Sequence, residues 1–286
     1  MDDILIELSD NDLEQLARMY ERHCKELPYL YSFLQICVKS KKIDMPDFVK
    51  VWSPNNCWKI DGTFIASVPN HGHDIILHSF DSSGKNLIEG LSKTKKFKYL
   101  RDPARSFTLF YAVDPEFYPK ILQLLNEQKH KILSNDASDV WVLNKENATK
   151  IQEDNEKVYV KNIQLEDLSV VNNHWPFKYP ESEQKLMDLS KLTKGLGVYL
   201  KSNNQLISWV VCSRLGQMGA LQTLGEYRFK GYAALAVKNM AKTLAEAGFD
   251  CCGSVDRGNV ASERLLSKLG FKKLRAYHYI AVQNEY

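Results

Sequence analysis

The sequence predicts an α/β (α+β) protein with two domains in tandem. Segments with the helical period and segments with the strand period alternate along the whole chain. One polar stretch without periodicity, residues 145–157, interrupts them and is typical of a linker. After it the pattern starts again with a strand, two helices and further strands. We therefore expect one domain over residues 1–150 and a second over residues 151–286.

Composition narrows the classes of function. The chain has 286 residues, of which 44% are hydrophobic and 26% charged, so it has room for two cores. A net charge of +3 with scattered lysines indicates no nucleic-acid partner. No apolar run approaches about 18 residues, and the acidic N-terminus lacks the features of a targeting peptide, which favours a cytoplasmic protein that binds no membrane. Six cysteines without C-x-x-C spacing indicate reduced thiols and no metal site.

The first half alternates helices and short strands. Ser9 or Asp10 is expected to cap a helix with an apolar face, and a second helix is expected over residues 29–38. Strands are expected over 48–52, 63–68, 75–80 and 106–113, separated by turn-forming residues. A helix over 116–129 and a strand over 139–143 complete this half.

The second half repeats this mixture of elements. We expect a strand over 158–163, a helix over 165–171, an irregular aromatic segment over 174–180 and a helix over 182–189. Strands are expected over 197–200, 205–212 and 218–224, followed by a helix from Gly231 to about Ala247. A strand over 249–255, a helix capped by Asn259 and a strand over 276–282 follow.

The segment from Gly225 to Ala233 joins a strand to a helix through a basic loop. The first turn of a helix has unpaired backbone N–H groups and the positive end of the helix dipole, and both favour a phosphate. Arg228 and Lys230 add positive charge, while Gly231 and Ala233 keep the surface low. The pattern predicts an anion-binding turn.

Two motifs together resemble the Gcn5-related N-acetyltransferase (GNAT) superfamily. The turn contains Arg228-x-x-Gly231-x-Ala233, and Asn259-x-x-Ser262-x-x-Leu265-x-x-x-Leu269-Gly270-Phe271 follows after one helix and one strand. The resemblance covers residues 158–282 and implies a mixed, mostly antiparallel sheet flanked by helices. It also implies a strand that diverges from its neighbour and leaves space for the pantetheine arm of CoA.

A closer resemblance is to the glycine N-acyltransferase-like family. Its residues here are Asn172-x-His174-Trp175-x-Phe177, then Ser182, Ser208-Trp209 and Gly225–Gly231. The first half is similar to that family's first domain, a degenerate GNAT-like unit. Because the first half has no equivalent turn, we expect CoA in the second domain.

The resemblance assigns contacts with acyl-CoA or acetyl-CoA, the co-substrate. Backbone groups of the turn would hold the pyrophosphate, Asn259 the pantetheine, and backbone N–H groups of the preceding strand the thioester carbonyl. The expected contact residues are Gln222, Thr223, Leu224, Arg228, Phe229, Lys230, Gly231, Tyr232, Ala233, Asn259 and Ser262.

The base that would deprotonate the amine is less defined. Many acetyltransferases carry a Glu early on this strand, where Gln217 and Met218 stand here, so Glu226, His174 and His278 are the candidates. Each also has a structural interpretation, as a solvated loop carboxylate or a packed histidine. Leu266 occupies the position of a tyrosine that commonly protonates the thiolate; Tyr277 or Tyr279 could replace it, or the thiolate could leave unassisted.

The function predicted is N-acyl transfer from acyl-CoA to a small amine such as glycine or another amino acid. Two alternatives are an acetyltransferase for a protein or polyamine amine, and a non-catalytic acyl-CoA-binding module. Trp175, Phe177 and Trp209 either belong to the core or form a wall around a substrate. The resemblance leaves a mitochondrial location open beside the cytoplasmic one, and a monomer is favoured.

Overall fold

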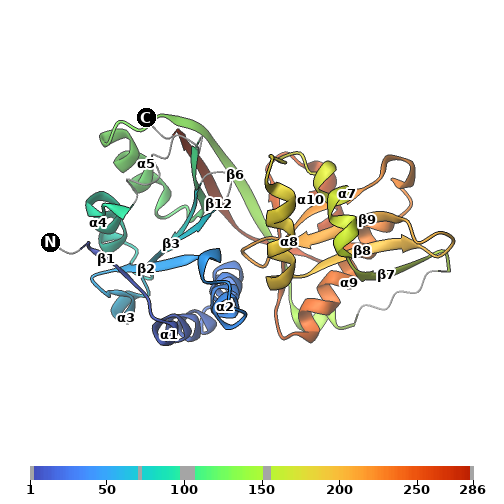
Figure 1. Ribbon diagram of the computed structural model, residues 1–286, viewed down its shortest axis with the longest axis horizontal. Helices are drawn as coiled ribbons and strands as arrows, with labels where there is room; N and C mark the ends of the chain where they lie inside the picture. The colour runs from blue at the N-terminus through green and yellow to red at the C-terminus, as the bar shows by residue number, and fades with distance from the viewer. Residues whose placement is uncertain (1–2, 70–72, 97–106, 151–155, 284–286) are drawn as a thin grey trace. The chain divides into compact units, whose positions relative to one another are not determined.

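The computed structural model describes residues 3–69, 73–96, 107–150 and 156–283 (Figure 1). The chain forms two compact units that are interleaved in sequence. Unit 1 comprises Met1–Cys24, Cys37–Ser138 and Ala276–Tyr286, and unit 2 comprises Lys25–Ile36 and Asp139–Arg275. Each unit combines helices with a mixed sheet, which confirms the predicted fold class. The boundary at residue 150 stays a prediction, and residues 151–155 lie outside the described residues.

Unit 1 is a mixed sheet with helices. Its elements are β1 (Leu5–Glu7), α1 (Asp10–Glu21), η1 (Pro46–Phe48), β2 (Lys50–Pro54), α3 (Trp58–Asp61), β3 (Phe64–Pro69), β4 (His73–His78), α4 (Lys85–Lys93), β5 (Phe107–Val113) and α5 (Tyr118–Glu127). The strand order is β1-β2-β3-β4-β5-β12-β6, where β12 is Lys272–Gln283 and β6 is Ile132–Leu143. Neighbours from β1 to β4 are antiparallel, and β4 and β5 are parallel.

The first helix begins as the sequence predicts. Ser9 caps α1, and its hydroxyl accepts a hydrogen bond from the N–H of Asp12 at 3.2 Å. The predicted apolar face is buried, including Leu13, Leu16 and Tyr20. The second predicted helix is longer than expected, because α2 runs over Pro28–Lys42. The predicted turn at 70–72 and the first residue of the strand over 106–113 lie outside the described residues.

Helix α4 was missed by the sequence pattern, because Gly90 interrupts its apolar face. Leu87 and Leu91 are buried on either side of Gly90, which is itself buried. A Cβ on Gly90 would lie 2.6 Å from Pro54 Cγ and 3.2 Å from Ile65 Cδ1. The residue that weakens the helical signal is therefore the one that lets α4 approach the sheet.

We expect Gly90→Ala to destabilise unit 1 even though alanine is the better helix former. The overpacking against Pro54 should outweigh the helix propensity and cost about 1–3 kcal/mol. Chemical denaturation measures this change. Ser92→Ala on the exposed side of the same helix is the matched control, and a Gly90→Ala protein as stable as that control would contradict the packing.

Unit 2 contains the other part of the sheet, which is also mixed. Its elements are the part of α2 up to Ile36, the end of β6, α6 (Lys145–Ala148), β7 (Val158–Asn162), η3 (Leu165–Asp167), α7 (Leu168–Asn173), α8 (Ser182–Leu192), β8 (Gly195–Leu200), β9 (Leu206–Cys212), β10 (Met218–Thr223), η4 (Gly225–Tyr227), α9 (Tyr232–Glu246), β11 (Cys251–Asp256), α10 (Val260–Lys268) and the start of β12. The strand order is β12-β6-β11-β10-β9-β8-β7.

Three predictions about the joining segments are corrected. The polar stretch from residue 145 begins with a helix, α6, capped by Asn144 and buried at Ala148. The strand predicted over 276–282 starts at Lys272, and the strand predicted over 139–143 starts at Ile132. Both strands are longer because each runs from one unit into the other.

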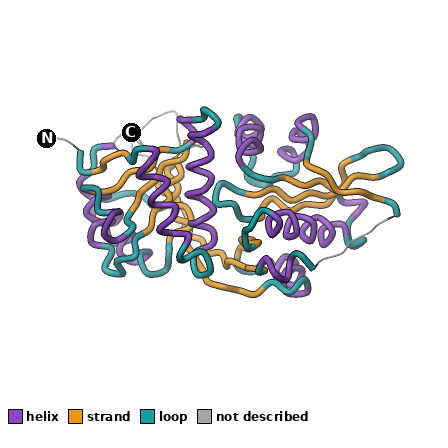
Figure 2. The backbone as a smooth tube through the Cα atoms, turned by 90° about the horizontal axis from the view of Figure 1, so that it is seen from below, coloured by secondary structure: helices purple, strands orange, loops and turns teal. Residues whose placement is uncertain are grey.

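Helices cover both faces of the sheet in unit 2 (Figures 1 and 2). On one face, Val237, Met240 and Ala241 of α9 form a core with residues of β8, β9 and β11. On the other face, Val171 of α7 and Leu186 of α8 pack around Trp209 of β9. Trp209 is almost fully buried, which settles its role in favour of the core. These two layers fix β10 between them.

Candidate functional site

Strands β10 and β11 diverge in unit 2. They are parallel and pair at Met218 and Gly253, whereas β10 stays paired with β9 as far as Thr223. The N-terminal end of β10 is therefore inside the sheet. Its C-terminal end is paired with β9 on one edge, and on the other edge β11 has diverged from it.

A β-bulge lies where the divergence begins. Gly219 pairs with Val211 and Gln222 pairs with Trp209, so β10 has one more residue than β9 over this interval. Ala220 within the bulge has a φ of 44°, in the left-handed region. Bulges of this kind often lie beside active sites, where they redirect backbone groups.

The backbone direction after the bulge follows from one hydrogen bond. Leu224 donates its N–H to the carbonyl of Ile207 at 2.9 Å, so this donor is used towards β9. Successive residues of a strand point their N–H groups to opposite sides. The N–H of Gln222 therefore points towards β9, as that of Leu224 does. The N–H of Thr223 points the opposite way, to the edge of β10 from which β11 has diverged. Of the three expected donors to a thioester carbonyl, Thr223 has the required direction.

The basic loop folds back onto the end of β10. Arg228 donates from Nε to the carbonyl of Thr223 at 3.2 Å, and Lys230 donates from Nζ to the carbonyl of Glu226 at 2.9 Å. The Lys230 ammonium also lies 5.5 Å from the ring centre of Tyr227. Both basic side chains are exposed and lie beside the start of α9.

Gly231 is the N-cap of α9 for a conformational reason. Its φ is 85°, in the left-handed region, and a Cβ there would meet no atom within 4 Å. No side chain caps this helix, and Tyr232 and Ala233 open its first turn, where N–H groups have no partner in the helix. Phe229, with a φ of 62°, is fully exposed on the same loop.

Asn259 and Ser262 start α10. The Asn259 side-chain oxygen accepts a hydrogen bond from the N–H of Ser262 at 3.2 Å, which confirms the predicted cap. Asn259 is exposed, and Ser262 is half-buried. The Asn259 amide nitrogen is on the exposed side chain, so the residue can cap α10 and still donate to a ligand.

His174 lies at the end of α7 against β9 and β10. Its Nδ1 is 2.8 Å from the carbonyl of Val170, and its ring meets the edge of Trp209 at 5.6 Å between ring centres. A carbonyl can only accept, so Nδ1 carries the proton in this bond and Nε2 is left as an acceptor. The amide of Gln222 also lies 3.5 Å from the His174 carbonyl oxygen. The fold thus brings His174, Trp209 and Gln222 together.

The other candidate bases lie elsewhere. Glu226 is exposed on η4, and its backbone carbonyl is bonded to Lys230. His278 belongs to unit 1, where its ring stacks on Tyr118 with 3.8 Å between ring centres. Tyr277 and Tyr279 also belong to unit 1, joined by a 3.0 Å hydrogen bond between their hydroxyls. The structure therefore does not bring His278, Tyr277 or Tyr279 into the unit that carries the basic loop.

Sequence reasoning missed the polar contacts that position the segment around His174. Ser182, at the start of α8, donates to the Asn172 side chain at 2.5 Å, and both residues are buried. Trp175, half-buried, and Phe177, largely exposed, lie on the segment between them. Asn172 and Ser182 sit at the ends of two helices, where small polar residues often make such bonds, and that spacing is the available signal.

Unit 1 contains a counterpart of the basic loop with the opposite chemistry. Strand β4 leads through residues 79–84 into α4, as β10 leads into α9. Asp81 accepts from the N–H of Ser83 at 2.9 Å and from its hydroxyl at 2.6 Å, and these bonds from Ser83 lower the pKa of the carboxyl. The Asp81 carboxylate thus accepts from both donors of Ser83 in this loop, beside which Lys120 also lies, and the location of CoA in unit 2 stays a prediction.

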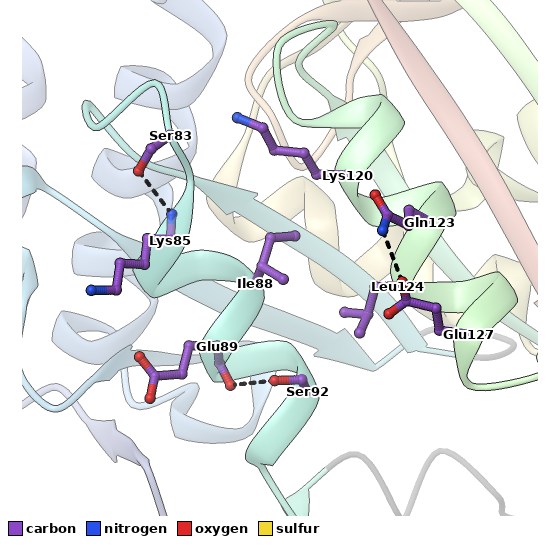
Figure 3. Close-up of a pocket in the computed structure, with 9 residues that line it drawn as sticks. All are labelled: Ser83, Lys85, Ile88, Glu89, Ser92, Lys120, Gln123, Leu124 and Glu127. Atoms are coloured by element: carbon purple, nitrogen blue, oxygen red, sulfur yellow. Dashed lines mark hydrogen bonds between the residues drawn. The ribbon is translucent and has the colours of Figure 1, made fainter.

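A groove of about 540 Å³ lies between α4 and α5 in unit 1 (Figure 3). Ile88 and Leu124 face each other across it. On its rim, Gln123 is bonded to Glu127 on the same helix, and Lys120 of α5 donates to the Ser82 carbonyl in the loop before α4. The groove contains none of the predicted site residues.

The fold and parts of the sequence match known families and structures. Residues 195–280 match the family model of FR47-like protein, and residues 4–124 match a domain of unknown function (DUF5645). A Drosophila protein solved by X-ray crystallography is similar with a TM-score of 0.87 at 20% identity, over 99% of both chains. A tandem GNAT protein from the clavulanic acid biosynthesis pathway has a TM-score of 0.61 at 9% identity, over 99% of this chain and 98% of its own. The fold is therefore that of a tandem GNAT protein.

Named relatives specify the resemblance further. Human glycine N-acyltransferase is 23% identical over 212 residues, which cover 74% of this chain and 65% of that protein. Human glycine N-acyltransferase-like protein 2 is 26% identical over 162 residues, or 54% of this chain and 51% of that protein. The chain thus spans between half and two thirds of the length of these relatives. The predicted resemblance to the glycine N-acyltransferase-like family of the GNAT superfamily is confirmed.

The described residues contain neither a membrane-spanning helix nor a metal-binding cluster. None of the helices in the described ranges is long and apolar enough to cross a membrane. Within the same part of the chain, no cluster of three or more His, Cys, Asp or Glu side chains is arranged to hold a metal ion.

Proposed function

We propose that this protein is an N-acyltransferase that moves an acyl group from acyl-CoA to the amine of a small acceptor such as glycine or another amino acid. The observation that carries the proposal is the divergence of β10 from β11 beside an uncapped helix start with two exposed cations. The names of the similar proteins support the reaction class. The acceptor is inferred from the residues around His174.

The residues of unit 2 fit acyl-CoA. The first turn of α9 supplies backbone donors and the positive end of the helix dipole, and Gly231 leaves open space where a side chain would project. Arg228 and Lys230 stand on the same loop and complement the pyrophosphate charge. The N–H of Thr223 points to the side of β10 where a thioester would lie.

His174 is the base that this geometry favours. The amine nitrogen attacks the thioester carbonyl carbon, so a C–N bond forms while the carbonyl oxygen becomes an oxyanion that the N–H of Thr223 stabilises. His174 Nε2 takes the proton from the amine, because Nδ1 is engaged with Val170. The C–S bond then breaks and CoA leaves as a thiolate, whose ordinary pKa makes it a fair leaving group.

The segment around His174 favours a small acceptor over a polycationic one. Residues 174–180 contain Lys178 and no carboxylate, and Glu181 follows, so the segment has no acidic cluster that would select a polyamine or a lysine-rich protein. Lys178 lies 3.4 Å from the Asn173 side chain and remains exposed, where it can attract the carboxylate of an amino acid. A carboxylate-bearing amine is therefore the acceptor class we propose.

A thiol-release assay tests this function. The purified protein would be incubated with a panel of acyl-CoAs and amines, and free CoA thiol would be followed with time. We expect thiol release with amino acids and none with polyamines. CoA binding without thiol release for any pair would refute catalysis and leave the non-catalytic binding module, whereas release with polyamines alone would refute the acceptor class.

A further inference from the structure

Gln222 contacts both the residue proposed to bind the acyl donor, Thr223, and the residue proposed as the base, His174. Its side-chain oxygen lies 3.4 Å from the N–H of Thr223, the donor proposed for the thioester carbonyl. Its side-chain nitrogen lies 3.5 Å from the backbone carbonyl of His174, the proposed base. One amide thus joins the donor side to the acceptor side, and we call these two contacts the Gln222 bridge.

The position of Gln222 in β10 allows both contacts. Gln222 directly follows the β-bulge and pairs with Trp209, so its side chain is on the face where His174 packs against that ring. The residue is half-buried between β10 and the end of α7. The amide therefore has two neighbours within hydrogen-bonding distance, and its contact with His174 is open to solvent.

We propose that the Gln222 amide occupies the oxyanion position in the free protein and is displaced by the thioester carbonyl when acyl-CoA binds. This inference rests on the proposed function of unit 2. A backbone N–H makes one good hydrogen bond, so the thioester oxygen and the Gln222 side-chain oxygen compete for Thr223. When the thioester takes that donor, the Gln222 amide loses one partner and keeps the other, the carbonyl of His174.

The displacement links acyl-donor binding to the position of the base. Before acyl-CoA binds, the Gln222 amide contacts both Thr223 and His174. After acyl-CoA binds, it contacts only the backbone carbonyl of His174. Free CoA has no thioester carbonyl and leaves the Gln222 bridge intact. The protein should thus distinguish acyl-CoA from CoA through Gln222, a positioning residue that takes no part in bond making.

Two substitutions change the competition in opposite directions. Gln222→Met keeps the shape and removes both hydrogen-bonding groups, so Thr223 no longer has a competing acceptor. Gln222→Glu keeps an acceptor and makes it a charged, stronger one, while it removes the donor to His174. Gln184→Met is the matched control, because Gln184 is an exposed glutamine on α8 whose amide bonds Asp188 on its own helix.

Calorimetric titrations with acetyl-CoA and with free CoA test the proposal. We expect Gln222→Met to bind acetyl-CoA about three- to tenfold more tightly than wild type. Gln222→Glu should bind acetyl-CoA more weakly than wild type, by about three- to tenfold or more. Free CoA should bind both variants as it binds wild type, and Gln184→Met should match wild type for both ligands. In steady state, Gln222→Met should show a lower KM for acetyl-CoA together with a lower kcat.

The outcomes separate this inference from the function on which it rests. Equal changes in acetyl-CoA and CoA affinity, or none, in the two Gln222 variants would overturn the competition at Thr223. A lower affinity of Gln222→Met for acetyl-CoA would also overturn it, because the bridge would then hold the ligand. Failure of wild type to bind either ligand would refute the CoA site itself, and this inference with it.

Discussion

Gly231→Glu is expected to lower the affinity for CoA at least a hundredfold, or by on the order of 3 kcal/mol, while the protein stays folded. The new side chain projects into open space at the N-terminus of α9, so the fold tolerates its volume. Its carboxylate stands where the pyrophosphate would lie, competes for the same N–H groups and repels the ligand. Titration with CoA measures the loss.

Gly248→Glu is the control for backbone strain. Gly248 follows the C-terminal end of the same helix with a φ of 91°, and a Cβ there would meet no atom within 4 Å. A non-glycine residue in this conformation costs about 1–2 kcal/mol at either end. Both variants should therefore lose similar thermal stability, and Gly248→Glu should keep its CoA affinity. Equal CoA affinity in the two variants would contradict the site at α9.

His174→Ala is expected to reduce kcat by about 10²–10⁴-fold with little change in acyl-CoA binding. The reason is that the hydrogen bond from Nδ1 to Val170 leaves Nε2 as the basic nitrogen on the acceptor side. His23→Ala is the matched control, since His23 is an exposed histidine of unit 1 that packs on Phe80. Steady-state kinetics at saturating acyl-CoA make the comparison.

Glu226→Gln separates the two candidate bases of unit 2. If Glu226 were the base, its amide variant would lose activity and His174→Ala would not. Both side chains are exposed, but a hydrogen bond to Val170 orients the His174 ring, whereas within the described part of the chain no hydrogen bond orients the Glu226 carboxylate. This difference favours His174. A large loss in Glu226→Gln with an active His174→Ala would therefore contradict the assignment.

Local signals in the sequence predicted most elements of unit 2 and the start of α1 in unit 1. The caps at Ser9 and Asn259, the stripe of α9 and the strand before Gly225 were all visible, because each depends on residues within one or two turns. Helix α4 was not, since its apolar stripe contains a glycine whose purpose is contact with Pro54 and Ile65, far away in sequence. Local patterns fail where a distant contact selects the residue.

The interleaving of the two units also depends on long-range contacts. β6 and β12 each contribute to both units, and the pairing of strands more than a hundred residues apart leaves no trace in a local period. The candidate site shows the same division. The anion-binding turn is a local motif, whereas the contacts of Gln222 with His174 and of Ser182 with Asn172 arise from packing between elements.

The most direct test of the account is a crystal structure of the full chain with an acyl-CoA bound. We expect the pyrophosphate at the first turn of α9 and the thioester oxygen within hydrogen-bonding distance of the Thr223 N–H, with the Gln222 side chain turned away from that donor. An acyl-CoA bound elsewhere, or a thioester oxygen held by another group while Gln222 still contacts Thr223, would contradict it.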